Sequence, residues 1–220
     1  MFVKICGIRD VETALAVAQA GADAIGLNFH EGSPRVVAPV AAAEIVSRLR
    51  ELPGIAIEPV GVFVNHKIDE IRSICRQCRL RTVQLHGDEM PEVLAELTGE
   101  FRVVRAFRVG HEGLDSLARH LDACQRIGAT PWACLVDSKV EGKYGGTGHT
   151  APWDMLRREY KAADWPPLIL AGGLRPDNVA DAIRAVRPWG VDVAGGVELS
   201  VACKDATLVR QFVQNARTSP

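Results

Sequence analysis

The chain has 220 residues and a formal net charge of −1, with 47% hydrophobic and 24% charged residues. This length predicts one domain or two small ones, and the composition is that of a globular protein. The near-neutral charge argues against a general nucleic-acid binder, which normally carries a basic excess. MFVKICGIRD is no secretory signal, and no apolar run approaches the roughly 18 residues of a membrane span. We therefore expect a cytoplasmic protein with reduced cysteines and no nucleic-acid or membrane partner.

Short apolar runs alternate with segments of helical periodicity along the chain. Strands are expected to start near residues 2, 24, 58, 82, 102, 133, 167 and 191. Apolar residues at i, i+3 and i+4 spacing predict helices near 11–18, 42–49, 68–78, 90–97, 114–121, 179–186 and 208–213. The segment around Trp153 and Leu156 is the weakest helix. Asp10 is expected to cap the first helix, and Pro176 to lie in the first turn of the helix that follows the seventh strand.

Strands that alternate with single helices predict an α/β fold with a parallel sheet and right-handed crossovers. A doubly wound open sheet shares this alternation, but the even spacing of eight units favours a closed (β/α)8 TIM barrel. We expect residues 1–220 to form one barrel domain, with about 216–220 as a frayed tail.

Two strands end in residues suited to proton transfer. Cys6 closes FVKIC and Asp137 closes ACLVD, and barrel strands present their carboxyl ends at one common mouth. A thiol and a carboxyl opposed there could act as general base and general acid, and Lys4 on the same face could favour the thiolate. The alternatives are a small buried hydrophobe at Cys6 and an ordinary strand-ending cap at Asp137.

Glycine pairs follow the last three strands, at Gly145-Gly146, Gly172-Gly173 and Gly195-Gly196. Glycine lets backbone N–H groups approach an anion closely, and barrels often bind phosphate after strands seven and eight. Tight turns that merely need positive φ are the alternative. We favour phosphate binding, because three successive pairs exceed what turns require.

Polar residues also follow the second and fourth strands. Arg35, in Ser33-Pro34-Arg35, could clamp a carboxylate or could be a solvated surface residue. His86 could position substrate or satisfy a loop backbone. Cys75 and Cys78 have zinc-like spacing, but they lie on one apolar helical stripe, which favours core packing. We expect no metal site.

Together these residues resemble the phosphoribosylanthranilate isomerase family of tryptophan biosynthesis. The resemblance spans nearly the whole chain, through KICGI (4–8), GLNF with SPR (26–35), GVFVN (61–65), QLHGD (84–88), LVD (135–137), GGTG (145–148), AGGL (171–174), VDVAGGVE (191–198) and KD (204–205). Many members read VDVSSGVE in the eighth block, where this chain has Ala194-Gly195, and Cys203 replaces a frequent glycine. The first change implies a phosphate grip that rests more on backbone amides.

The resemblance implies a cofactor-free Amadori rearrangement of N-(5-phosphoribosyl)anthranilate, a small phosphosugar substrate. Cys6 would be the base, Asp137 the acid and Arg35 the clamp for the anthranilate carboxylate, while the glycine pairs would hold the phosphate. We expect a monomer rather than a homodimer. Another phosphosugar barrel enzyme, a non-catalytic phosphate-binding barrel and a zinc or redox protein remain as alternatives.

Overall fold

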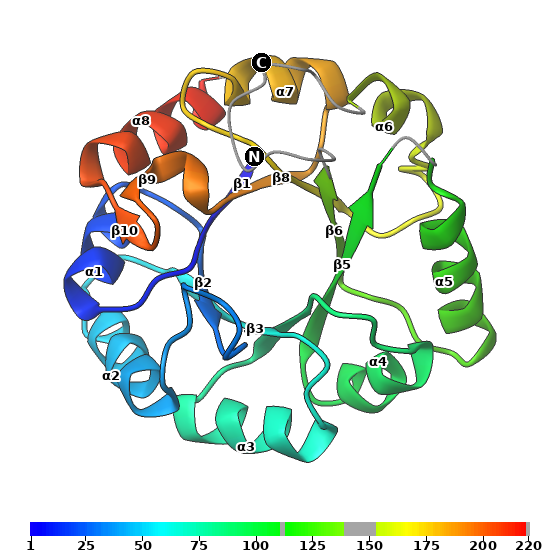
Figure 1. Cartoon of the computed structure of the whole chain (residues 1–220), viewed down its shortest axis with the longest axis horizontal. Helices are drawn as coiled ribbons and strands as arrows, with labels where there is room; N and C mark the ends of the chain where they lie inside the picture. Colours follow the sequence, from blue (N-terminus) through cyan, green and yellow to red (C-terminus); the bar gives the residue numbers. More distant parts are fainter. Residues whose placement is uncertain (111–112, 139–152, 219–220) are drawn as a thin grey trace.

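The computed structural model describes residues 1–110, 113–138 and 153–218. Eight parallel strands close into a barrel in chain order, and the helices surround it (Figure 1). The strands are β1 (Phe2–Cys6), β2 (Ala24–Asn28), β3 (Glu58–Phe63), β4 (Thr82–Leu85), β5 (Arg102–Val109), β6 (Ala133–Ser138), β7 (Leu168–Ala171) and β8 (Gly190–Val193). The helices are α1 (Val11–Gln19), α2 (Pro39–Arg50), α3 (Ile68–Cys78), α4 (Pro91–Thr98), α5 (Asp115–Arg126), α6 (Trp153–Glu159), α7 (Val179–Val186) and α8 (Ala206–Arg217). The predicted barrel is confirmed, and the open sheet is excluded.

Local signals placed most helix boundaries correctly. The Asp10 carboxylate accepts a hydrogen bond of 2.8 Å from the Thr13 backbone N–H, so the predicted cap of α1 is confirmed. Two expectations were wrong. Met90 precedes α4 and is 64% exposed, because Pro91 at the first helical position starts that helix. Pro176 lies in a turn before α7, which begins only at Val179.

The last helix, α8, is anchored to the loop before β2. It continues to Arg217, into the segment expected to fray, while residues 219–220 lie outside the described residues. The Arg217 guanidinium donates hydrogen bonds to the Gly21 carbonyl at 3.0 Å and to the Asp23 carboxylate at 2.8 Å. These contacts give the helix end partners on the loop before β2. No described helix is long and apolar enough to cross a membrane.

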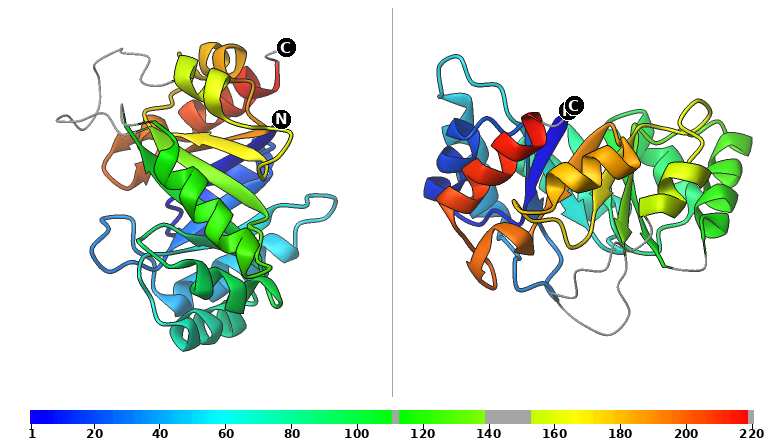
Figure 2. Two further views of the ribbon diagram at one scale, coloured as in Figure 1. Left: turned by 90° about the vertical axis from the view of Figure 1, so that its right-hand side faces the viewer. Right: turned by 90° about the horizontal axis from the view of Figure 1, so that it is seen from above.

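A short hairpin that the periodicity did not predict follows β8. A 3₁₀ turn, η1 (Gly195–Val197), leads into β9 (Glu198–Ser200) and β10 (Cys203–Lys204), which pair antiparallel. The chain reverses direction between the two strands at Ala202, whose φ is +64°. Cys203 does not have a positive φ, so this position does not require glycine. The hairpin lies next to α8, on the side of the barrel to which the strands direct their carboxyl ends (Figure 2, right).

The barrel has an apolar core outside its strands, and its interior is apolar on one side and polar on the other. A large apolar cluster fills the space between strands and helices. A smaller one lines the barrel interior on β5, β6 and β7, with Val104, Ala106, Ala133, Leu135, Ile169 and Ala171. The interior contributed by β1, β4 and β8 is polar instead: Lys4, Gln84 and Asp192 are at most 7% exposed. This polar half lies directly below the carboxyl ends of the strands that carry Cys6 and His86.

Candidate active site

Cys6 ends β1 above a buried ion pair. The Lys4 Nζ lies 2.7 Å from the Asp192 carboxylate of β8, the residue to which Lys4 is paired in the barrel register. Burial raises the pKa of the Cys6 thiol, while the charges of Lys4 and Lys204 act to lower it. Asp192 opposes them. The thiol therefore depends on a balance of nearby charges, as the sequence predicted for Lys4.

The β2 strand makes room for the thiol. Gly26 is the register partner of Cys6, and a Cβ built on Gly26 would lie 2.6 Å from the Cys6 sulfur. A contact that short is repulsive, so any larger residue would push the sulfur away from its position. Gly26, the glycine of the GLNF motif, is therefore needed to leave space for the Cys6 sulfur.

Asp137 is the penultimate residue of β6 and faces His86 at the mouth. The His86 Nε2 lies 3.9 Å from the Asp137 carboxylate, and 39% of the Asp137 side chain is exposed. Partial burial in the barrel mouth raises the pKa of Asp137, and the charge of Asp192 raises it further, while Arg108 lowers it. A carboxyl with a raised pKa holds its proton at a higher pH than an ordinary aspartic acid.

His86 is neutral at physiological pH. Burial and the charge of Lys4 lower its pKa to about 4. The Gln84 side-chain nitrogen lies 2.8 Å from the His86 Nδ1, and an amide NH2 can only donate. With the Gln84 amide in this orientation, the His86 Nδ1 accepts and the proton lies on Nε2, the nitrogen nearer Asp137. His86 is therefore placed as an uncharged hydrogen-bond donor beside the carboxyl.

Arg35 is held in the loop after β2. The Ser33 hydroxyl accepts a hydrogen bond from the Arg35 backbone N–H and another from the Asn28 side chain, each at 3.1 Å. The Arg35 guanidinium donates two parallel hydrogen bonds, of 2.8 and 2.7 Å, to the Glu198 carboxylate. Arg35 is thus an ordered, ion-paired residue at the mouth, and the alternative of a freely solvated arginine is excluded.

The loops after β7 and β8 come together at their glycines. Gly172 and Gly173 have φ of +87° and +64°, which glycine adopts without strain. A Cβ on Gly196 would lie only 1.8 Å from the Leu174 carbonyl oxygen, so the two loops touch at a point where only glycine fits. Gly195 lies beside the Arg35 guanidinium. Gly145 and Gly146 lie outside the described residues.

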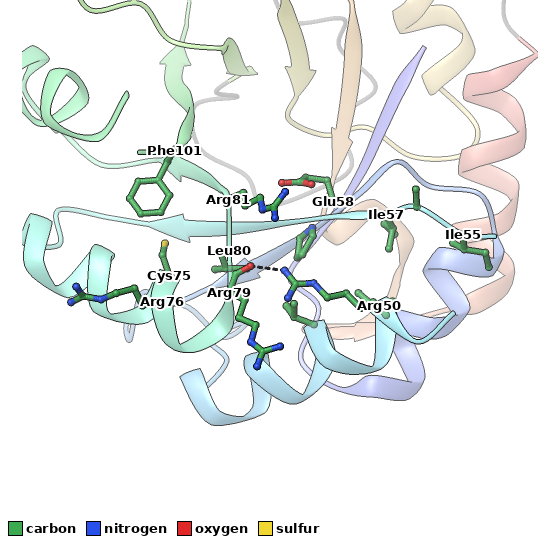
Figure 3. Close-up of a pocket in the computed structure, with 14 residues that line it drawn as sticks. Arg50, Ile55, Ile57, Glu58, Cys75, Arg76, Arg79, Leu80, Arg81 and Phe101 are labelled. Carbon is green, nitrogen blue, oxygen red and sulfur yellow. Dashed lines mark hydrogen bonds between the residues drawn. The ribbon is translucent and has the colours of Figure 1, made fainter. Parts of the chain in front are cut away.

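A cavity of about 660 Å³ lies elsewhere, at the amino-terminal ends of β3 and β4 (Figure 3). It is lined by apolar residues, four arginines and Glu58, and the Arg50 guanidinium donates a 2.7 Å hydrogen bond to the Arg79 carbonyl there. It contains none of the candidate site residues, and barrel enzymes use the opposite end of their strands. Cys75 borders this cavity and, like Cys78, is 1% exposed in the core, which confirms the packing interpretation.

Comparison with known proteins identifies the family. The family model described as N-(5'phosphoribosyl)anthranilate (PRA) isomerase matches residues 3–215. The chain belongs to this family. The N-(5'-phosphoribosyl)anthranilate isomerase of Geobacter metallireducens is 44% identical over 98% of each chain.

Solved isomerase structures share the barrel over its whole length. The phosphoribosyl anthranilate isomerase of Thermotoga maritima superposes with a TM-score of 0.85 at 35% identity, over 99% of this chain and 98% of that one. Another isomerase, in complex with reduced 1-(o-carboxyphenylamino)-1-deoxyribulose 5-phosphate, gives 0.82 at 33% identity and the same coverage. A further Thermotoga maritima structure, at 34% identity, a TM-score of 0.81 and again the same coverage, is described as monomers generated from a dimeric isomerase.

Three polar residues of this isomerase-family site escaped the sequence interpretation. Asp192 interrupts the apolar strand GVDV, and Glu198 and Lys204 occur within quoted motifs, but no role followed from their positions. The buried Glu198 carboxylate joins Arg35 to the Lys204 Nζ, which lies 2.5 Å from it. An acidic or basic residue in a short buried segment is the signal that could have marked them.

Proposed function

We propose that Cys6 is the general base and Asp137 the general acid of the isomerisation of N-(5'-phosphoribosyl)anthranilate, the reaction of this family in tryptophan biosynthesis. The product is 1-(2-carboxyphenylamino)-1-deoxyribulose 5-phosphate, an aldose-to-ketose change. The carbon skeleton is kept and no net oxidation occurs. The chemistry therefore requires only proton transfers, which side chains supply.

Asp137 opens the sugar. Its carboxyl protonates the ring oxygen as the bond from that oxygen to C1 breaks, and the nitrogen lone pair forms the C1=N iminium bond. Burial raises the pKa of Asp137, which keeps a proton available at a higher pH. The His86 Nε2–H, 3.9 Å from the carboxylate, stabilises the charge that remains after the proton has left.

Cys6 then removes the proton from C2. The electrons of that C–H bond form the C1=C2 bond of an enolamine, and the iminium nitrogen becomes neutral. Tautomerisation places a proton on C1 and leaves the ketone at C2. The thiolate that this step needs is favoured by Lys4 and Lys204, while the 2.7 Å contact of Lys4 with Asp192 limits the effect.

Two anion sites orient the substrate. Arg35 binds the anthranilate carboxylate through the part of its guanidinium that Glu198 leaves open. The backbone N–H groups at Gly172, Gly173, Gly195 and Gly196 bind the sugar phosphate. Gly145 and Gly146, which lie outside the described residues, are assigned the same role from the sequence pattern alone. Ala194 carries no hydroxyl, so the loop after β8 binds the phosphate through backbone amides.

The observation that carries the proposal is the placement of a thiol, a carboxyl and an arginine at one barrel mouth in a chain of this family. The test is incubation of the purified chain with freshly generated substrate, with the product identified by its C2 ketone signal in ¹³C NMR. Deuterium at C2 should slow kcat when removal of that proton limits the rate. Ketose formation at the spontaneous rate would contradict the proposal.

We propose further that residues 1–220 act as one cytoplasmic barrel domain and as a monomer. Most exposed large apolar residues of the described surface lie on separate elements, such as Val40 on α2, Met90 before α4 and Ile127 after α5. Leu199 and Val201 lie together, on the hairpin. Light scattering coupled to size exclusion should give the mass of one chain, 23.8 kDa. Twice that mass would contradict the monomer.

A further inference from the structure

Glu198 links the carboxylate clamp to the rest of the site. It begins β9, and it meets Arg35 from a position 163 residues away in sequence. Both guanidinium nitrogens that face it are used, Nε at 2.8 Å and NH2 at 2.7 Å. Of the guanidinium nitrogens, NH1 alone makes no hydrogen bond within the described part of the chain. Glu198 therefore determines which edge of the Arg35 guanidinium is available to bind a ligand.

The Glu198 carboxylate is itself fixed from two further directions. The Lys204 Nζ donates a hydrogen bond of 2.5 Å to Oε1, and the Ala202 backbone N–H donates one of 3.1 Å to Oε2. The Glu198 and Lys204 side chains are 4% and 2% exposed. These bonds, with the one to Arg35, lower the pKa of Glu198 to about 2, against the effect of burial. The carboxylate is thus charged throughout the physiological range.

The stem of Arg35 is confined as well. Gly7 has a φ of +84°, and a Cβ there would lie 2.6 Å from the Arg35 Cδ. A Cβ on Gly195 would lie 3.4 Å from NH2. Arg35 therefore passes between two glycine-containing loops before it reaches Glu198, and little rotamer freedom is left to it.

The charges of this cluster leave one positive charge uncompensated. With Cys6 as a neutral thiol, the cationic Arg35 and Lys204 and the anionic Glu198 carry a net charge of +1. The Arg35 side chain is 25% exposed, so it can present this charge to an added carboxylate. Lys204 also donates a 3.0 Å hydrogen bond to the Ala194 carbonyl, in the loop proposed to bind phosphate. One cluster thus connects the two anion sites.

We propose that Glu198, braced by Lys204, is a positioning residue that sets the specificity for a substrate with an aryl carboxylate, by holding Arg35 in its binding orientation. This inference rests on the proposed role of Arg35. Because the guanidinium is ordered before the ligand arrives, binding the carboxylate costs little side-chain entropy. Within the described part of the chain Glu198 makes no hydrogen bond to Cys6 or Asp137. Any effect that passes through Lys204 to Cys6 or to the phosphate loop is common to all substrates, so the effect specific to one substrate should be on the recognition of its carboxylate.

The test compares two substrates, N-(5-phosphoribosyl)anthranilate and N-(5-phosphoribosyl)aniline, which lacks the carboxylate. Glu198→Gln should lower kcat/KM for the anthranilate roughly tenfold or more beyond its effect on the aniline value, mainly through KM. Glu198→Asp keeps the charge and should fall between. Glu100→Gln is the matched control, because Glu100 also accepts from an arginine, Arg72, on the outer surface.

Each other outcome has a distinct meaning. Equal losses on both substrates would overturn the proposal, because Glu198 would then be a general structural residue. A selective gain on the anthranilate would overturn it too, since Glu198 would then compete with the substrate for Arg35. If Glu198→Gln does not fold, Glu198→Asp carries the same comparison. If the wild type turns over neither substrate, the proposed function fails, whereas equal wild-type activity on both removes the Arg35 clamp alone.

Discussion

Cys6 and Gly26 are register partners on β1 and β2, and the missing side chain of Gly26 provides the space that the Cys6 sulfur occupies. A Cβ at Gly26 would lie 2.6 Å from that sulfur. Gly26→Ala should therefore displace the thiol and lower kcat by roughly 10- to 100-fold, because proton transfer depends on distance. Steady-state kinetics check this. Gly99→Ala, at a site with open space around it, is the control and should keep full activity.

Lys4 and Asp192 form the buried ion pair beneath the thiol, so removing one partner should be costly. Lys4→Met leaves the Asp192 charge buried and should lower the free energy of unfolding by about 3–5 kcal/mol. Denaturant titration measures this. Lys4→Met combined with Asp192→Asn should recover part of the loss, since neither charge then remains. A single variant as stable as the wild type would show that the pair does not contribute.

The pH dependence of kcat/KM should be a broad plateau. Activity needs a protonated Asp137 and an ionised Cys6, and both pKa values are raised, from 3.8 and 9.0. Because the carboxyl still titrates below the thiol, kcat/KM should rise with pH through the Asp137 pKa. It should stay level near neutrality and fall only above pH 9.0.

The limbs of that profile can be assigned. On the plateau only the minor form, with the acid protonated and the thiol ionised, reacts. Measurements of kcat/KM in overlapping buffers from about pH 5 to about pH 10 cover the plateau and the start of the alkaline fall. An alkaline fall centred near neutral pH would contradict the assignment of Cys6 as a base with a raised pKa.

Arg35→Ala should act mainly on binding. The lost charge-assisted hydrogen bond should raise KM by roughly 10- to 100-fold, with a smaller change in kcat. Arg184→Ala, which removes an exposed arginine paired with Asp181 on α7, is the control. Unchanged KM and kcat/KM in Arg35→Ala would remove Arg35 from the site.

The barrel could be predicted because its strands follow a regular period. All eight strands begin within one residue of the expected position, for example β7 at 168 and β8 at 190. Apolar strands and amphipathic helices are local patterns, and a closed parallel sheet is the arrangement that eight such units support. The location of Cys6, His86 and Asp137 at the barrel mouth could be predicted from the same period, because the carboxyl ends of all the strands meet there.

The hairpin and the charge cluster could not be predicted in this way. β9 has three residues and β10 has two, too short for any periodicity. The bond between Arg35 and Glu198 joins residues 163 apart, and that between Lys4 and Asp192 joins residues 188 apart. Such pairs depend on barrel register and loop geometry, which a single sequence does not contain.

The most direct test of the account compares the wild type with Cys6→Ala and Asp137→Asn. The assay follows loss of substrate fluorescence above spontaneous breakdown, with folding checked by circular dichroism and Cys203→Ala as an exposed-thiol control. We predict that both variants fold and that each loses at least about 100-fold in kcat, while the control keeps its activity. Wild-type turnover in either folded variant would contradict the role assigned to that residue.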